Sequence, residues 1–339
     1  MRILRSPICG LGLALLELVA GACKAPDSDP FSHLTEQGGS DSSAAGAEQG
    51  GAEQGGAKQG GAGTGGVASG EAGAKPAGGS GGGGGDSGCP AGSPVGANCA
   101  CAATQQDLEN CQALAAGILH RYSFNGTGLI VDDSVSGGSN GTMVNMTLTG
   151  SGDANFTSAG QYVDLPNHLV SSLTSVTLEA WATWKSGAPW QRIFDFGDTT
   201  IGAEGEQGFG RSYLFLSPRG TGSFVRAVFK SATGVELVVD SSPSLTSGVL
   251  THVSVTFDDT RKLMSLYVAG KLGSTVAVTD SLADINDINN WLGRSQYNID
   301  PAYTGSIQEF RVYGVALTAA QVAFSNAQGP DTALFAHAQ

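Results

Sequence analysis

The sequence predicts an all-β fold, an antiparallel two-sheet jelly-roll sandwich, over its C-terminal two-thirds. Short runs in which apolar and polar residues alternate follow one another from Ile118 onward, as in residues 176–183. Turn-forming pairs such as Asn140-Gly141 separate these runs. All seven Tyr, all four Trp and twelve of the thirteen Phe lie beyond residue 119, so we expect the hydrophobic core there.

The first 22 residues predict a secretion signal. An apolar run over residues 8–16 follows two Arg, and Ala20 and Ala22 satisfy the small-residue rule for cleavage. The residues before Cys23 also resemble the bacterial lipobox, although Ala20 stands where that motif usually has Leu. The resemblance implies lipid modification of Cys23 and an exported, envelope-anchored or extracellular protein, with free secretion as the alternative.

Residues 23–88 predict a flexible, low-complexity linker. Gly, Ala, Ser, Gln and Glu dominate, and a five-residue repeat recurs over residues 47–61. A chain of about fifty Gly-rich residues has a root-mean-square span of roughly 40 Å. Such a linker can lift a domain off a membrane surface, or it can be a spacer with no selected length.

Four cysteines define a small segment over residues 89–116. Export favours two disulfides among Cys89, Cys99, Cys101 and Cys111. Cys99 and Cys101 are poorly placed to bond each other, so we expect each to pair with Cys89 or Cys111. A zinc site is the alternative, but its usual C-x2-4-C spacing is not present.

The jelly-roll domain is expected over residues 117–330, followed by a tail over 331–339. In residues 250–257, Val253, Val255 and Phe257 share one face, as a core-facing strand requires. One helix is predicted near the end, where Thr318 and Gln321 form a capping box. The predicted strands are 120–124, 161–165, 176–183, 191–196, 213–217, 224–230, 235–240, 250–257, 263–269, 275–279, 289–295 and 306–314.

The ordered set of motifs resembles a LamG-like, concanavalin A-type jelly-roll domain. The motifs include HRYSFNGTG, GQYVDLP, SVTLEAWATW, QRIFDFG, LTHVSVTFD and GSIQEFRVYGVALTAAQV, and the resemblance covers residues 120–322. It implies a sandwich with a concave face, of the kind found in lectin-like, adhesive and carbohydrate-binding modules that often carry one calcium ion. The fold alone does not assign a function.

Catalysis is not expected, because no paired-carboxylate motif is present. Glu179 has no acidic partner at the same-face positions of its strand, so it is interpreted as a sheet-surface carboxylate or a partner of Arg192. No G-x-S-x-G nucleophile elbow occurs. The net charge of −13 and the lack of clustered Lys and Arg exclude nucleic acid as a partner.

A calcium site is a hypothesis for the loop over residues 132–141. Asp133 and Asn140 offer oxygen ligands there. Relatives often close such a site with an acid early in the last strand, where this chain has Gln308. We expect Asp133, Asn140 and Gln308 to converge on one ion, with an ordinary Asp- and Gly-rich turn as the alternative.

Candidate ligand-binding aromatics are Trp184, Trp190 and Trp291. The first two flank a loop-like stretch, residues 185–189, and Trp291 follows two Asn. Large aromatics in a sandwich are more often core residues. The leading hypothesis is a non-catalytic module that binds a glycan or a cell-surface protein. The alternatives are a structural envelope lipoprotein without a dedicated ligand and a divergent glycoside hydrolase.

Overall fold

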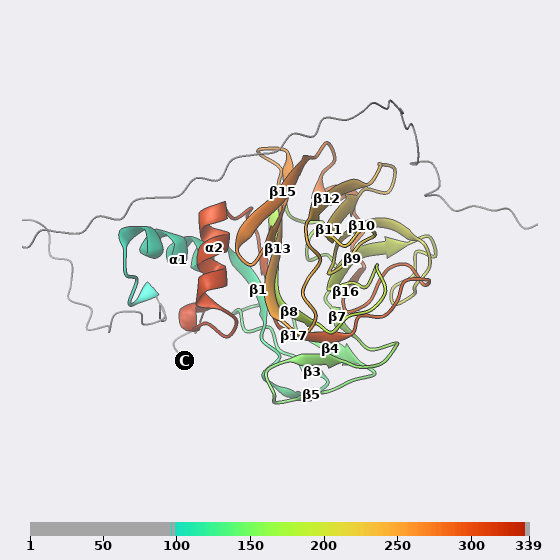
Figure 1. Cartoon of the computed structure of the whole chain (residues 1–339), viewed down its shortest axis with the longest axis horizontal. Coiled ribbons are helices and arrows are strands. Elements are labelled where there is room, and N and C mark those ends of the chain that lie inside the picture. The colour runs from blue at the N-terminus through green and yellow to red at the C-terminus, as the bar shows by residue number, and fades with distance from the viewer. Residues whose placement is uncertain (1–95, 97–98, 336–339) are drawn as a thin grey trace, which may run out of the picture. The chain divides into compact units, whose positions relative to one another are not determined.

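A computed structural model describes residues 96 and 99–335, and it confirms the predicted antiparallel sandwich (Figure 1). The predicted signal (1–22), Cys23, the linker (23–88) and Cys89 lie outside the described residues. Every pairing between the described strands is antiparallel. Neither of the two described α-helices is long and apolar enough to cross a membrane.

One layer of the described sandwich is a seven-stranded sheet in the order β1-β17-β8-β13-β14-β15, with β6 paired to β17. Its strands are β1 (Ile118–Tyr122), β6 (Ala154–Phe156), β8 (Val176–Trp184), β13 (Leu250–Asp258), β14 (Leu263–Val268), β15 (Lys271–Ala277) and β17 (Gly305–Tyr313).

The other layer is an eight-stranded sheet in the order β12-β11-β10-β9-β16-β7-β4-β3. Its strands are β3 (Ile130–Val131), β4 (Gly141–Val144), β7 (Tyr162–Leu165), β9 (Phe194–Thr199), β10 (Gly210–Ser217), β11 (Val225–Lys230), β12 (Leu237–Ser241) and β16 (Asn289–Leu292). A small ribbon pairs β2 (Thr127–Gly128) with β5 (Leu148–Thr149).

The core lies between the sheets and is built from alternate residues of each strand. Val253, Val255 and Phe257 are fully buried in it, as their period of two predicts. Phe194 and Phe196 on β9 face them from the other sheet, and both rings contact Phe310 of β17. The residues between these positions therefore point to the outer faces.

Two helices pack over the outer face of the seven-stranded sheet. The predicted C-terminal helix is α2 (Ala319–Gln328), and its Thr318–Gln321 capping box is present. The prediction of a single helix is wrong, because α1 (Gln105–Gly117) packs beside α2 (Figure 1). Two short 3-10 helices also occur, η2 (Leu282–Asp284) and η3 (Ala333–Phe335).

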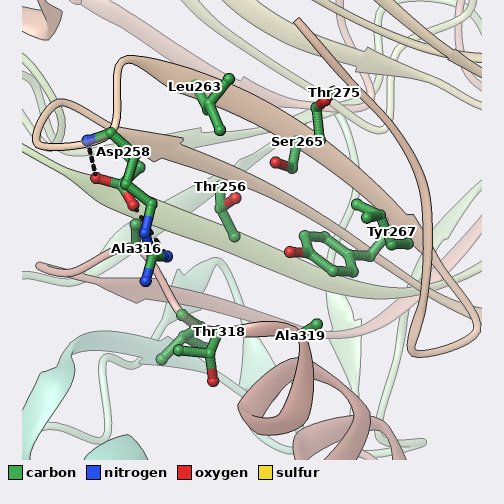
Figure 2. Close-up of a pocket in the computed structure, with 12 residues that line it drawn as sticks. Thr256, Asp258, Leu263, Ser265, Tyr267, Thr275, Ala316, Thr318 and Ala319 are labelled. Atoms are coloured by element: carbon green, nitrogen blue, oxygen red, sulfur yellow. Dashed lines mark hydrogen bonds and ion pairs between the residues drawn. The ribbon is translucent and has the colours of Figure 1, made fainter.

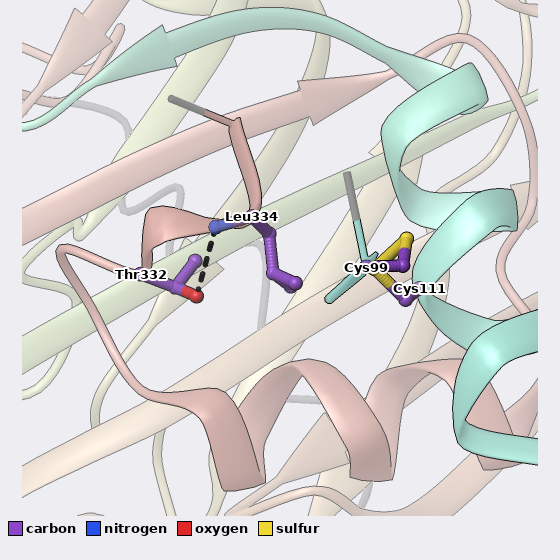
Figure 3. Close-up of a disulfide and its surroundings, with 4 residues drawn as sticks. All are labelled: Cys99, Cys111, Thr332 and Leu334. Carbon is purple, nitrogen blue, oxygen red and sulfur yellow. Dashed lines mark hydrogen bonds between the residues drawn. A yellow bond between two sulfur atoms is a disulfide. The ribbon is translucent and has the colours of Figure 1, made fainter. Parts of the chain in front are cut away.

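A disulfide joins Cys99 to Cys111 on α1, which confirms one of the expected pairings. Both cysteines are buried in a second apolar cluster that includes Leu334 and Tyr313. Figure 3 shows Leu334 of this cluster together with the disulfide. The described part of the predicted tail therefore packs against the cysteine segment, and Cys101 is also disulfide-bonded.

A buried charge network lies beneath α2 on this sheet. Glu179 is fully buried, and its Oε1 is 2.9 Å from Nε2 of His252. Its Oε2 accepts hydrogen bonds from Tyr313 (3.1 Å) and Ser325 (2.8 Å) and lies 3.5 Å from Nη1 of Arg311. The interpretation of Glu179 as a surface carboxylate or a partner of Arg192 is wrong, because α2 covers this face.

Candidate functional site

The outer face of the eight-stranded sheet carries a row of polar and aromatic side chains. Asp164 on β7, Trp291 on β16 and Asp195 on β9 lie opposite one another in the antiparallel pairing. Phe215 on β10 continues the row opposite Asp195. Residues directly opposite each other on antiparallel strands share a sheet face. These four side chains therefore form one continuous line away from the core.

Arg294 lies over this row, just beyond the end of β16. Its guanidinium carbon is 4.1 Å from the ring centroid of Trp291 and 4.3 Å from that of Tyr162. Trp291 donates its Nε1 hydrogen to Oδ1 of Asp164 at 3.1 Å. We call Tyr162, Asp164, Trp291 and Arg294 the Arg294 cluster.

The Arg294 cluster holds an unsatisfied donor. Nη1 of Arg294 is buried and has no hydrogen-bond partner within the described residues. A buried donor left without a partner costs about 1–3 kcal/mol, so nearly all such groups in folded proteins are paired. An acceptor supplied by water or a ligand would satisfy this nitrogen.

The ionisable groups of the cluster are all shifted by their surroundings. Burial raises the pKa of Asp164, and the nearby Glu204 raises it further, against the opposing effects of Trp291 and Arg294. Burial lowers the pKa of Arg294, while Tyr162, Asp164 and Glu206 oppose this change. Two carboxylates, Asp164 and Glu206, thus act on the guanidinium, and a third, Glu204, acts on Asp164, so acidic groups outnumber the one cation of the cluster. Groups with perturbed pKa values that lie together outside the core are candidates for function.

A second network fastens the loop over residues 293–304 to the same face. Arg192 donates from Nε to Asp195 (3.2 Å) and from Nη2 to Asp300 (2.8 Å). Ser295 donates to Asp300 at 2.7 Å. Burial raises the pKa of Asp195 to about 7, against the effects of Arg192 and a backbone N–H. The carboxylate of Asp195 is fully buried, so it holds the loop rather than facing solvent.

Two of the three predicted ligand-binding tryptophans lie on this face. Trp291 is fully buried, because Arg294 covers its ring. Trp190 is half-buried beside Phe215, and the guanidinium carbon of Arg226 lies 5.4 Å from its ring centroid. Trp291 thus belongs to the candidate site as the ring on which Arg294 stacks. Trp190 lies on the same sheet face, beside the site.

Trp184 lies elsewhere and corrects the prediction for that residue. It is the last residue of β8 and packs in the core between the sheets, where it is 5% exposed. Its Nε1 donates to Oε1 of Gln191 at 2.6 Å, so the indole nitrogen is already satisfied. Residue 184 is therefore a core position, and a surface ligand does not reach it.

The predicted calcium ligands are only partly brought together. Asn140 accepts a hydrogen bond from the Asp133 backbone N–H at 2.9 Å. The Asp133 carboxylate accepts backbone N–H groups from Arg121, Val135 and Ser139. Gln308 is half-buried on β17 and shares no hydrogen bond with either residue in the part of the chain described.

Among the described residues, no group of three or more His, Cys, Asp or Glu side chains is arranged to hold a metal ion. Asp133 also lies 2.7 Å from Nδ1 of His120. A cation at Asp133 would therefore have to replace hydrogen bonds that already hold the loop.

Sequence reasoning did not single out Arg294, Tyr162 or Asp164. A usable signal exists for two of them, because Tyr162 and Asp164 alternate with the core residues Val163 and Leu165. Polar residues at outward positions of a central strand are candidates for a site. Arg294 has no such periodic signal, since it follows the end of β16.

Comparison with known proteins defines the class of this fold. Residues 156–323 match the family described as the concanavalin A-like lectin/glucanases superfamily. The sandwich is therefore a concanavalin A-like lectin/glucanase domain, as the ordered motifs indicated. A comparison with curated proteins found no match.

Several solved structures are similar to part of this chain at low identity. A CBM40 domain of the Ruminococcus gnavus IT-sialidase, bound to alpha2,3 sialyllactose, is 17% identical, with a TM-score of 0.40 over 50% of this chain and 96% of that one. Domain 4 of AbnA, an extracellular GH43 arabinanase from Geobacillus stearothermophilus, in complex with arabinotriose, is 17% identical, with a TM-score of 0.43 over 61% and 97%.

A Trypanosoma rangeli sialidase is also similar, at 17% identity and a TM-score of 0.47 over 65% of this chain and 37% of that one. These similarities concern the fold only.

Proposed function

We propose that this chain is a non-catalytic glycan-binding module whose ligand binds at the Arg294 cluster. The observation that carries the proposal is the buried Nη1 of Arg294, which has no partner within the described residues and lies beside the half-buried Asp164. A guanidinium that donates and a carboxylate that accepts suit neighbouring sugar hydroxyls. Tyr162 is half-buried and offers apolar ring surface at the same place.

The charges at the cluster favour an uncharged glycan. Asp164, Glu204 and Glu206 act on the cluster against one cation, Arg294. A ligand that carries a carboxylate would meet net repulsion there, and rejection by like charge contributes to specificity. The proposed ligand is therefore a neutral saccharide rather than an acidic one. A cell-surface protein partner stays the alternative.

Catalysis is not part of the proposal. Asp195 and Asp300 are two neighbouring carboxylates, but both accept hydrogen bonds from Arg192. The guanidinium therefore lies between them, where a substrate would have to bind. The Asp195 carboxylate is fully buried, so it does not reach a glycosidic oxygen. A hydrolase of this fold would need a separated, accessible acid and nucleophile.

A glycan array with the full chain tests the proposal. Wild-type protein should retain neutral glycans, whereas Arg294→Ala should lose at least about tenfold in affinity, equivalent to about 1.4 kcal/mol. Lys271→Ala, which removes an exposed cation from β15 of the opposite sheet, is the matched control and should bind like wild type. An array without binding would favour the structural envelope alternative.

We also propose that the domain is exported and displayed on a lipid-anchored tether. The residues that support this, the predicted signal and Cys23, lie outside the described residues. Labelled palmitate should enter the wild-type chain and not Cys23→Ala. Calcium binding by Asp133, Asn140 and Gln308 stays a prediction, and it requires a melting temperature that is higher in millimolar calcium than in chelator.

A further inference from the structure

A cavity lies on the opposite sheet, between strands β13, β14 and β15 and the segment that leads into α2 (Figure 2). Its volume is about 260 Å³, just below the range of about 300–1,000 Å³ typical of sites for drug-sized ligands. The cavity is therefore large enough for one small ligand. It lies on the other side of the core from the Arg294 cluster.

Hydroxyl groups from three neighbouring strands line the floor. Thr256 on β13, Ser265 on β14 and Thr275 on β15 are paired across the sheet, so their side chains share the outer face. The Tyr267 ring completes the floor, and Figure 2 shows its hydroxyl directed toward Thr256. Ser265 and Thr256 lie near this hydroxyl and lower the pKa of Tyr267.

The floor retains hydrogen-bonding capacity. Each hydroxyl has one donor and two acceptor lone pairs, so each of these groups can accept a hydrogen bond from a ligand. Burial raises the pKa of Tyr267, against the effects of Ser265 and Thr256, so its phenol stays neutral at physiological pH. A ligand that brings several hydroxyl donors without a net charge fits such a floor.

The walls are apolar and held in place. Leu263 and Leu272 stand on the strand side, and Ala319 stands at the start of α2. The segment before α2 is fixed by Thr177, whose hydroxyl donates to Val315 O at 2.8 Å and accepts from the Leu317 N–H at 2.9 Å. A preformed wall reduces the ordering cost of binding.

The charged residues at the rim neutralise each other. Arg261 lies 3.4 Å from Asp258, and both line the cavity. The rim therefore offers no uncompensated charge to an ionic ligand. Transfer of a carboxylate into a cavity without an unpaired cation is unfavourable.

We infer that this cavity is a second saccharide site, which binds one uncharged sugar ring through the hydroxyls of Thr256, Ser265 and Tyr267. The apolar walls contact the C–H face of the ring. The inference does not rest on the Arg294 cluster.

Titration of the full chain with methyl glucoside, followed by amide chemical shifts, tests the inference. Signals of Thr256, Ser265, Tyr267 and Ala319 should move, and they should move equally in Arg294→Ala. Thr275→Trp, at the exposed edge of the floor, should weaken binding at least about tenfold. Ala277→Trp, exposed on the same strand and outside the cavity lining, is the control and should leave binding unchanged.

Two further measurements test whether the floor hydroxyls bind the ligand and whether the ligand must be uncharged. Ser265→Ala removes a floor hydroxyl with little change in volume and should also reduce affinity. Methyl glucuronide carries the same ring with a carboxylate and should bind more weakly than the glucoside. The inference is overturned if no cavity signals shift, if only signals near Trp291 shift, or if the glucuronide binds more tightly.

Discussion

The outer faces of the two sheets both carry charged side chains, but they stabilise these charges differently. On the seven-stranded sheet, burial would raise the pKa of Glu179, yet His252 and Arg311 hold it below its usual value. On the eight-stranded sheet, burial raises the pKa of Asp164 and Asp195 despite their partners. The partners of Glu179 on the first face outweigh the effect of burial, whereas the partners of Asp164 and Asp195 on the second face do not.

This difference distinguishes a structural charge network from the proposed binding site. The charge network around Glu179 lies under α2, where Glu309 accepts hydrogen bonds from Arg121 and from the Asp331 backbone N–H. Its charges fasten the C-terminal segment to the sheet. On the other face, Asp164 lies beside Arg294, whose Nη1 lacks a partner among the described residues. Proteins commonly retain such unfavourable arrangements at functional sites.

The largest effect is expected from breaking the charge network around Glu179. Glu179→Ala removes the acceptor of His252 and Tyr313 and leaves Arg311 with one carboxylate fewer. Removal of one partner from a buried charge pair costs about 3–5 kcal/mol in the free energy of unfolding. Urea denaturation measures this loss. Glu204→Ala, an exposed control, should change stability by less than about 0.5 kcal/mol. Equal losses in both variants would contradict the account.

The next effect is a pH dependence that arises at the eight-stranded sheet. The raised pKa of Asp195, about 7, means that the folded chain keeps a proton that the unfolded chain releases near pH 4. Stability from this group is present below pH 4 and falls as the pH rises toward 7. Asp195→Asn cannot titrate, so its unfolding free energy relative to wild type should increase by about 2–4 kcal/mol from pH 4 to 8.

Denaturation curves at several pH values measure this difference. Asp132→Asn, at an exposed position, is the control and should follow the wild-type pH dependence within about 0.5 kcal/mol. A difference between wild type and Asp195→Asn that is constant with pH would show that Asp195 does not keep its proton.

A smaller effect is expected from the disulfide that joins Cys99, before α1, to Cys111 within this helix. Cys99 and Cys111 are 12 residues apart. Closure of a loop of about 15 residues contributes about 3 kcal/mol, so the double variant Cys99→Ala/Cys111→Ala should lose about 2–3 kcal/mol. Hydrogen exchange should show the loss of protection in α1 first. Unchanged protection there would indicate that packing alone holds the helix.

Strand periodicity explains why much of the fold was predictable. The twelve predicted runs correspond to β1 and to β7 through β17, most of which are long enough to show alternation. The strands β2 to β6 were not predicted, and four of these five have only two or three residues, too few to display a period. The helix α1 was missed as well, although Thr104 caps it through the Asp107 N–H, a recognisable start signal.

The candidate site was predictable only in part. Trp291 was identified from its residue type, but the sequence does not show that Arg294 covers it. Trp184 was misassigned because a position beside a loop does not reveal whether the indole points into the core. Both outcomes depend on tertiary packing, which determines the exposure of a large aromatic more strongly than its neighbours in the chain do.

The comparison of the two faces is tested most directly by measuring binding and stability together in Arg294→Ala. Removal of Arg294 loses its stacking on Trp291 and Tyr162, about 0.5–2 kcal/mol, but also removes a buried donor without a partner among the described residues, which costs about 1–3 kcal/mol. The two effects offset each other, so the free energy of unfolding should stay within about 1 kcal/mol of wild type. Affinity for a neutral glycan found on the array should fall at least about tenfold in the same preparation. A variant that loses stability and binds the glycan normally would contradict the account.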